Sequence, residues 1–181
     1  EMRWDDGTVN TASEPLSEEF AYRVFDIGNL WLFSGMRFPS QLSLFSTAGG
    51  ECRIFPASPT GTTLDDCHLY PGTGLAAGGK KDSLNEVNGR ITLHGTDMTN
   101  AVRFTHGEGY RHLDVRAALF GEGPLRIATS AVESKYMPEG NMTTIRLSGD
   151  NRNWTGPLQV TCAGGRINFD NETAAAWGKY E

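Results

Sequence analysis

The segment Thr144-Ile-Arg-Leu-Ser-Gly149 is followed by Leu158-Gln-Val160, Gly164-Gly165 and Ile167-Asn-Phe169. Apolar and polar residues alternate within the three short apolar segments, which is the period of a β-strand with one buried and one solvated face. Glycine follows the first segment and precedes the last, at positions where a chain can turn sharply. The stretch therefore predicts three short strands joined by glycine-containing corners.

The same pattern occurs twice more, earlier in the chain. Leu30-Trp-Leu-Phe-Ser-Gly35 opens the first copy and Arg90-Ile-Thr-Leu-His-Gly95 opens the second. The glycines at positions 35, 95 and 149 are 60 and then 54 residues apart, which is room for two or more coils of roughly 20 to 25 residues each. Internal repetition of short strands indicates a solenoid, in which each coil buries its inner face by stacking on its neighbours.

We therefore predict an all-β fold, a right-handed parallel β-helix, over residues 30–181. The three copies divide this region into related units, 30–89, 90–143 and 144–181. The alternative is an antiparallel β-sandwich, which also has many short strands between turns. Residues 1–29 are expected to form an N-terminal segment, and the sequence leaves open whether it is a cap, a further coil or a disordered leader.

Composition narrows the classes of partner. The chain has 181 residues, 38% of them apolar, with 22 glycines and a formal net charge of −6. Lysine and arginine form no cluster along the sequence, so nucleic acid and anionic membranes are not expected partners. No run of about 18 apolar residues is present, so we expect no transmembrane helix.

The three cysteines are Cys52, Cys67 and Cys162. At most one disulfide can form among them, and Cys52 and Cys67 are the pair nearest in sequence. Alternation continues the inward series of Leu158 and Val160 to Cys162 and also makes Cys52 an inward neighbour of the core. Both are therefore predicted to behave as small buried apolar residues without reactivity.

Part of the chain resembles a known family, the autotransporter-associated β-strand repeat. The resemblance covers residues 119–178 and rests on Leu147-Ser-Gly-Asp-Asn151, Trp154-Thr-Gly156, Gly164-Gly165 and Ala175-Ala-Trp-Gly178. It implies an exported, usually non-enzymatic β-helix, displayed at the bacterial surface in association with the outer membrane, and part of a longer chain. Host or cell-surface glycans or proteins are the expected partners, and no cofactor is expected.

One motif raises an enzymatic alternative. Asp65-Asp66-Cys67 resembles the paired carboxylates with which polygalacturonase-type β-helices cleave polysaccharides. Other motifs of that family, Asn-Thr-Asp, Gly-His-Gly and Arg-Ile-Lys, are absent from the sequence. We expect Asp65 and Asp66 to close a turn after Gly61-Thr-Thr, Asp5-Asp6-Gly7 to form another turn, and no residue to be catalytic.

Metal sites are not predicted either. The four histidines are His68, His94, His106 and His112. They are scattered along the sequence without the spacing of zinc ligands, and solvated positions in turns and strands are expected for them. The glycine–aspartate repeats of calcium-binding β-rolls are also absent from the sequence.

Aromatic residues suggest a third function, carbohydrate binding without catalysis. The rings expected in or beside loops are Tyr22, Tyr70, Tyr110, Tyr136 and Trp154. Such rings could stack on sugars, but we favour a role in anchoring loops against the solenoid. Three Asn-x-Thr sequons, at Asn141, Asn153 and Asn171, are attributed to turn composition.

Overall fold

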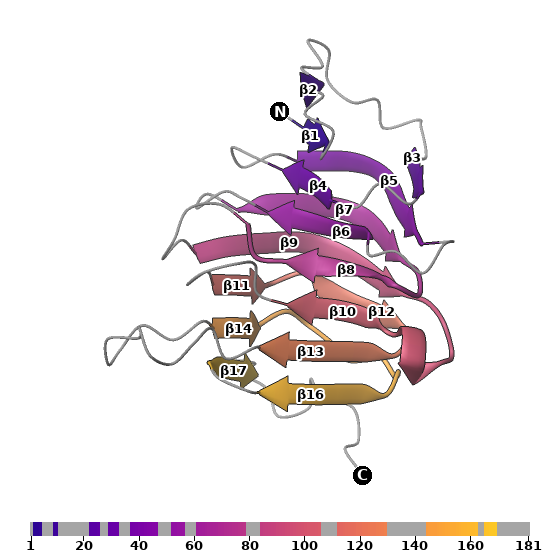
Figure 1. Ribbon diagram of the computed structural model, residues 1–181, viewed down its shortest axis with the longest axis vertical. Coiled ribbons are helices and arrows are strands. Elements are labelled where there is room, and N and C mark those ends of the chain that lie inside the picture. Colours follow the sequence, from indigo (N-terminus) through magenta and orange to yellow (C-terminus); the bar gives the residue numbers. More distant parts are fainter. Residues whose placement is uncertain are drawn as a thin grey trace.

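The chain winds into a right-handed parallel β-helix in this computed structural model. In Figure 1 the front strands point to the left, the strands behind them point to the right, and the chain descends from its N- to its C-terminus. This sense of winding is right-handed, so the predicted fold class is confirmed. The structure describes residues 2–4, 9–10, 22–25, 29–32, 37–46, 52–56, 61–78, 84–105, 112–129, 144–162 and 165–169.

Each coil contributes one strand to the front sheet, which we call sheet A, and one to the sheet behind, sheet B. The solenoid strands of sheet A are β4 (Asn29–Leu32), β6 (Cys52–Pro56), β8 (Thr73–Ala76), β10 (Val102–Thr105), β13 (Leu125–Thr129) and β16 (Leu158–Cys162). Those of sheet B are β3 (Tyr22–Phe25), β5 (Arg37–Phe45), β7 (Thr62–Leu69), β9 (Leu84–Leu93), β11 (His112–Val115), β14 (Thr144–Leu147) and β17 (Arg166–Phe169).

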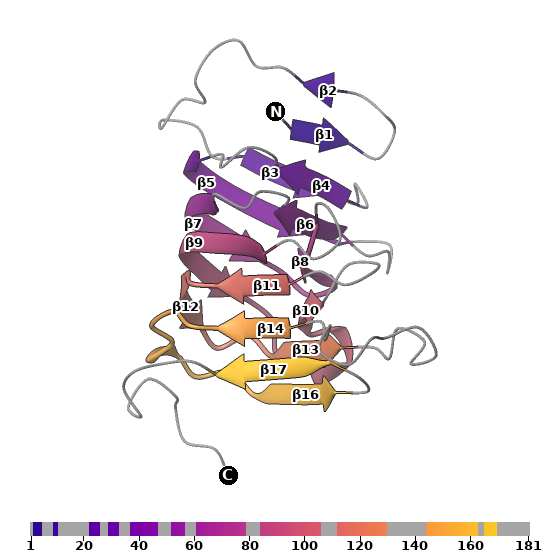
Figure 2. The ribbon, with the colours of Figure 1, turned by 90° about the vertical axis from the view of Figure 1, so that its left-hand side faces the viewer.

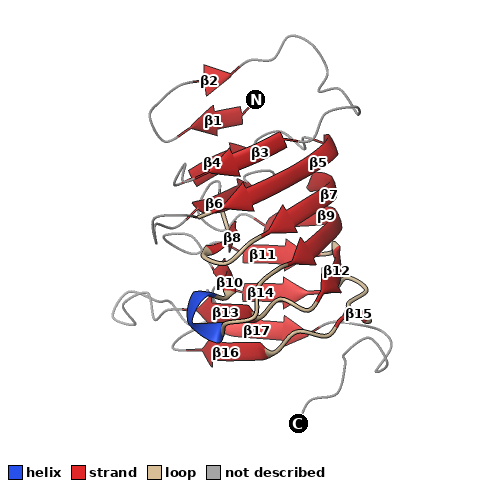
Figure 3. Ribbon diagram, turned by 90° about the vertical axis from the view of Figure 1, so that its right-hand side faces the viewer, coloured by secondary structure: helices blue, strands red, loops and turns tan. Residues whose placement is uncertain are grey.

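A third face arises because the long strands of sheet B bend. The first half of β9 pairs with β11 and its second half pairs with β12 (Ala118–Gly121), which in turn pairs with β15 (Asn153–Trp154). The register shifts between Leu64 and Cys67 of β7, a β-bulge at the same bend. We call the second halves of β5, β7 and β9, together with β12 and β15, the third face. It is visible on the side of the solenoid shown in Figure 3, as is the short 3-10 helix η1 (Met98–Asn100).

The core is built from inward-facing rows of apolar side chains in register. In sheet A, Leu30 pairs with Ile54, and Ile54 pairs with Leu75, and all three are buried. The coils differ in length, from 20 residues between the paired Val24 and Leu44 of sheet B to 33 between the paired Ile127 and Val160 of sheet A. Because the register between paired strands is fixed and only the corner loops vary in length, the apolar core is continuous from coil to coil.

The sandwich alternative is wrong, because every described pairing from β3 onward is parallel. Antiparallel pairing involves β1 (Met2–Trp4), which lies against the edge of β4 and also pairs with β2 (Val9–Asn10). Figure 2 shows this pairing at the N-terminal end of the solenoid. Because β3 already pairs in parallel with β5, the solenoid begins before residue 30; the division into three units stays a prediction.

The last described coil departs from the predicted burial. Val160 and Phe169 point inward by register, yet their side chains are 43% and 41% exposed. The prediction that Cys162 is buried is wrong: this residue continues the inward series but is exposed, because no described coil lies beyond it. Cys52 and Cys67 are buried, and both are free, so the bridge between them does not form.

These environments predict the order in which the thiols react. Burial raises the pKa of the Cys67 thiol, with a smaller contribution from the negative charge of Asp66. Because the thiolate is the nucleophile, we expect native protein to incorporate one equivalent of iodoacetamide, at Cys162, and denatured protein to incorporate three. Peptide mapping by mass spectrometry checks this result, and labelling of Cys67 in the native chain would contradict its burial.

Candidate functional site

The two carboxylates of the enzymatic alternative lie on the outer surface of the solenoid, in the middle of β7. The predicted turn is wrong, because Asp65 and Asp66 occupy the β-bulge where β7 bends toward the third face. Arg37 of β5 pairs with Asp65, with Nη2 at 2.7 Å and Nε at 2.9 Å from Oδ2. The bulge thus places both carboxylates near the corner between sheet B and the third face.

Asp66 begins a chain of polar contacts that runs along the third face. Its Oδ1 lies 3.2 Å from Nε2 of His68, and its Oδ2 accepts a hydrogen bond from Nε2 of Gln41 at 3.2 Å. Nδ1 of His68 lies 2.8 Å from Nε2 of His94, on the next coil. Two histidines predicted to be scattered are therefore hydrogen-bonded to each other, within reach of a carboxylate.

The carboxylate influences the position of the protons in this chain of contacts. Asp66 favours a proton on Nε2 of His68, which leaves Nδ1 of His68 to accept a hydrogen bond from His94. In the other neutral tautomer, Nδ1 of His68 donates to His94 and Nε2 accepts from Gln41, which lies 3.2 Å away. Either arrangement places a single proton between the two imidazoles. When both histidines are positively charged, two N–H donors face each other and the hydrogen bond between the rings is lost.

Aromatic stacking holds the histidine pair in place. The ring of Tyr70 lies between Phe45 and His94, with centroid distances of 4.2 Å and 4.3 Å. The planes of Tyr70 and His94 are within 9° of each other, and His94 also stacks on His68. Because the faces of Tyr70 are covered by neighbouring rings, this tyrosine anchors the solenoid, as predicted for the loop aromatics, and does not offer a face to a sugar.

The histidine pair predicts a loss of stability in mild acid. Burial, and then the charge of His68, lower the pKa of His94 below the ordinary 6.5 of an imidazole. The unfolded chain takes up this proton at a higher pH than the folded chain, so the free energy of unfolding decreases as the pH falls below the unfolded value and toward the folded one.

We expect His94→Gln to remove this part of the pH dependence between pH 7.5 and 5.5 in urea unfolding series. His112→Gln, a substitution of a histidine on β11 outside the pair, is the matched control and should retain the wild-type slope. An unchanged slope in His94→Gln would contradict the assignment.

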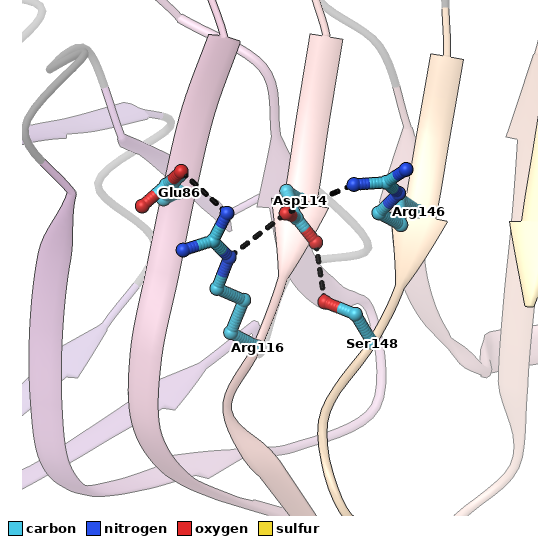
Figure 4. A network of polar contacts seen from close by, with 5 residues as sticks. All are labelled: Glu86, Asp114, Arg116, Arg146 and Ser148. Carbon is cyan, nitrogen blue, oxygen red and sulfur yellow. Dashed lines mark hydrogen bonds and ion pairs between the residues drawn. The ribbon is translucent and has the colours of Figure 1, made fainter. Parts of the chain in front are cut away.

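A second polar cluster lies on the outer surface of sheet B, around Asp114 (Figure 4). The carboxylate is 1% exposed and accepts hydrogen bonds from Oγ of Ser148 at 2.6 Å and from Nε of Arg116 at 2.9 Å. Nη2 of Arg116 continues to Glu86 at 2.7 Å, and Nη1 of Arg146 lies 3.9 Å from Asp114. The network joins β9, β11 and β14, so it ties three successive coils together.

Other predicted residues have separate positions. Trp154 is buried, and its Nε1 donates a hydrogen bond to the carbonyl of Gly123 at 2.8 Å, so it anchors a corner as predicted. His112 lies on β11 and Asn153 is exposed on β15. The following predicted residues lie outside the described part of the chain: Asp5, Asp6, His106, Tyr110, Tyr136, Asn141 and Asn171, and the side chain of Tyr22. Among the described residues, no group of three or more His, Cys, Asp or Glu residues could hold a metal ion.

Comparisons of the chain with protein-family models, with curated proteins and with solved structures find no match. The resemblance to the autotransporter-associated repeat therefore stays a prediction, which rests on the motifs quoted above. Within the described ranges, no helix is long and apolar enough to cross a membrane.

Proposed function

We propose that this chain is a secreted or surface-displayed bacterial β-helix module that serves structural display or adhesion and is not an enzyme. The observation that carries the proposal is the engagement of the candidate catalytic carboxylates by other side chains of the chain itself. Asp65 is paired with Arg37, and Asp66 is held by His68 and Gln41. Glycoside hydrolysis needs one carboxyl group to protonate the leaving oxygen and a second to act as base or nucleophile, whereas Asp65 is held in an ion pair by Arg37.

The geometry of the solenoid also suits the display of side chains at a surface. A parallel solenoid buries its apolar residues inward and exposes long rows of outward side chains whose spacing is set by the backbone. Such a rod can present several groups in line without movement of the scaffold, which is useful for adhesion to an extended ligand.

Protease shaving of intact cells of the native host tests the proposed location. We expect externally added protease to remove the protein while a cytosolic marker remains intact. Degradation only after lysis would contradict surface display, unless the protein is recovered from the culture medium.

A polysaccharide-cleaving enzyme is the alternative, favoured by the placement of Asp65 and Asp66 on one outer corner beside two histidines. Histidine next to a carboxylate is a common acid–base arrangement. A reducing-sugar assay over plant and host glycans separates the alternatives: we expect no release. Release by the wild type that disappears in Asp66→Asn but persists in Asp150→Asn, an exposed carboxylate elsewhere, would establish the enzyme instead.

A further inference from the structure

The histidine pair brings two metal-binding side chains together on the third face. His68 lies on β7 and His94 directly follows β9, and Figure 3 shows these two strands side by side. Nδ1 of His68 and Nε2 of His94 are 2.8 Å apart. Imidazole is the commonest metal ligand in proteins, and two neighbouring coils here direct one ring nitrogen each toward the space between them.

A carboxylate prepares His68 for metal binding. Oδ1 of Asp66 lies 3.2 Å from Nε2 of His68, the ring nitrogen that does not face His94. Histidines that bind metals usually donate their other N–H to a carboxylate or carbonyl oxygen, which fixes the tautomer and makes the ligating nitrogen more basic. With the proton on Nε2, Nδ1 of His68 carries a lone pair that faces His94.

No proton has to leave the pair when an ion binds. In the tautomer that Asp66 favours, Nε2 of His94 donates to Nδ1 of His68. An ion that replaces this hydrogen bond needs a lone pair on both nitrogens, so the proton of His94 moves from Nε2 to Nδ1 of the same ring. Both imidazoles stay neutral, which is the state in which histidine binds metals.

The distance between the two nitrogens indicates the coordination geometry. Metal–imidazole bonds of about 2.0–2.1 Å place two nitrogens about 2.9 Å apart at a right angle and about 3.3 Å apart at the tetrahedral angle. The observed 2.8 Å is close to the right angle, which is the angle in square-planar and tetragonal sites of Cu²⁺ and Ni²⁺. The strands therefore need not separate, and a pivot of each ring in its own plane turns both lone pairs toward one ion. Such a pivot keeps His94 stacked on Tyr70, whose plane is within 9° of its own.

Water can supply the remaining ligands. Both histidines are partly exposed, and the side chain of His68 is 19% exposed. Thr92 pairs in register with His68, and its buried Oγ1 has no hydrogen-bond partner among the described residues. A buried hydroxyl without a partner costs free energy, and a water molecule bound to an ion at the histidine pair is a partner of the required kind.

We propose that the histidine pair binds one divalent transition-metal ion, Cu²⁺ in preference to Ni²⁺ and Zn²⁺, with water in the remaining positions. The preference follows from the right-angle spacing and from the general order of metal affinities, in which Cu²⁺ ranks highest. Asp66 is a positioning residue, which orients His68 and does not touch the ion. The site goes beyond the display role proposed above and does not depend on it.

Isothermal titration calorimetry of the purified chain tests the proposal at pH 7.5, above the ordinary pKa of about 6.5 for histidine. The probes are Cu²⁺ buffered with glycine, Ni²⁺, Zn²⁺ and Mg²⁺, a hard ion that prefers oxygen ligands. We expect one Cu²⁺ per chain, bound at least tenfold more tightly than Zn²⁺, and no binding of Mg²⁺. Electron paramagnetic resonance of the Cu²⁺ complex should show coupling to two imidazole nitrogens.

Variants locate the site. His94→Gln should weaken Cu²⁺ binding at least tenfold, whereas His112→Gln, which removes a histidine outside the pair, should leave the affinity within twofold. Asp66→Asn should weaken binding about tenfold at an unchanged melting temperature, and Asp150→Asn is its matched control. Equal affinities in Asp66→Asn and Asp150→Asn would overturn the positioning role of Asp66.

Absence of Cu²⁺ binding would overturn the proposal, as would full affinity in His94→Gln or binding of Zn²⁺ that is tighter than that of Cu²⁺. If His94→Gln does not fold, the wild type decides. Cu²⁺ should then broaden the imidazole NMR signals of His68 and His94 at a lower concentration than those of His112, and the reverse order would contradict the site. These outcomes are distinct from those of the surface-display test, because metal binding does not depend on where the cell places the protein.

Discussion

Replacing Gly89 with alanine is expected to lower the free energy of unfolding by about 3 kcal/mol. Gly89 lies at the bend of β9 with φ of +102°, a backbone conformation that L side chains rarely adopt. An added Cβ would stand 1.9 Å from the carbonyl oxygen of Leu64 on the neighbouring strand. Because a β-strand carbonyl cannot swing aside as a side chain can, the coils must separate locally, which adds an overpacking cost of about 1–3 kcal/mol to the conformational one.

Gly61→Ala is the matched control for this substitution. Gly61 also has a positive φ, of +81°, but the nearest atom to its added Cβ is the side-chain Nδ2 of Asn88 at 2.8 Å. This flexible side chain can move, so Gly61→Ala should show the conformational cost alone. Urea unfolding followed by circular dichroism gives both values, and equal losses in the two variants would argue against a tight approach of β7 and β9 at the bend.

Replacing Asp114 with alanine should also be strongly destabilising, with a loss of about 3 kcal/mol in the free energy of unfolding. The carboxylate is buried beneath Arg116 and accepts short hydrogen bonds from two side chains. Hydrogen bonds to charged groups contribute about 1.5–3 kcal/mol each, and the arginines that remain would repel each other. Because Arg116 is 45% exposed, water offsets part of this loss, so the effect should stay below the sum of the individual bonds.

The exposed pair of Asp150 and Arg152 provides the comparison for this measurement. Its two side chains are 43% and 62% exposed, and surface ion pairs contribute little to stability. Asp150→Ala should therefore shift the urea midpoint much less than Asp114→Ala, and raised salt should narrow the shift caused by Asp150→Ala more than that caused by Asp114→Ala. Similar shifts in both variants would mean that Asp114 is not sealed from solvent.

The fold could be predicted from sequence where alternation and stacking act together. Ile145 and Leu147 alternate with polar residues, and both are fully buried. Val160 and Cys162 obey the same alternation and still face solvent. Alternation determines the side of the strand on which a residue lies, whereas burial requires another coil to cover it, and a local pattern does not contain that information.

The polar clusters could not be predicted because they depend on coil length. His68 and His94 are 26 residues apart, and Ser148 is 34 residues from Asp114. Since the coils range from 20 to 33 residues, no constant offset in the sequence identifies the partner on the next strand. The positions of Asp65 and Asp66 within a strand could not be predicted because aspartate is rare in strands, and a β-bulge is a site that tolerates it.

The unequal coil lengths also bear on how such a chain can change over time. Paired strands keep their register whether 20 or 33 residues separate them. A corner loop can therefore gain or lose about a dozen residues without displacing the coils on either side of it. Mutations can then change the length and sequence of a protruding loop while the solenoid core beneath it is preserved. A designer could use the same corners to graft foreign peptides at chosen heights along the rod.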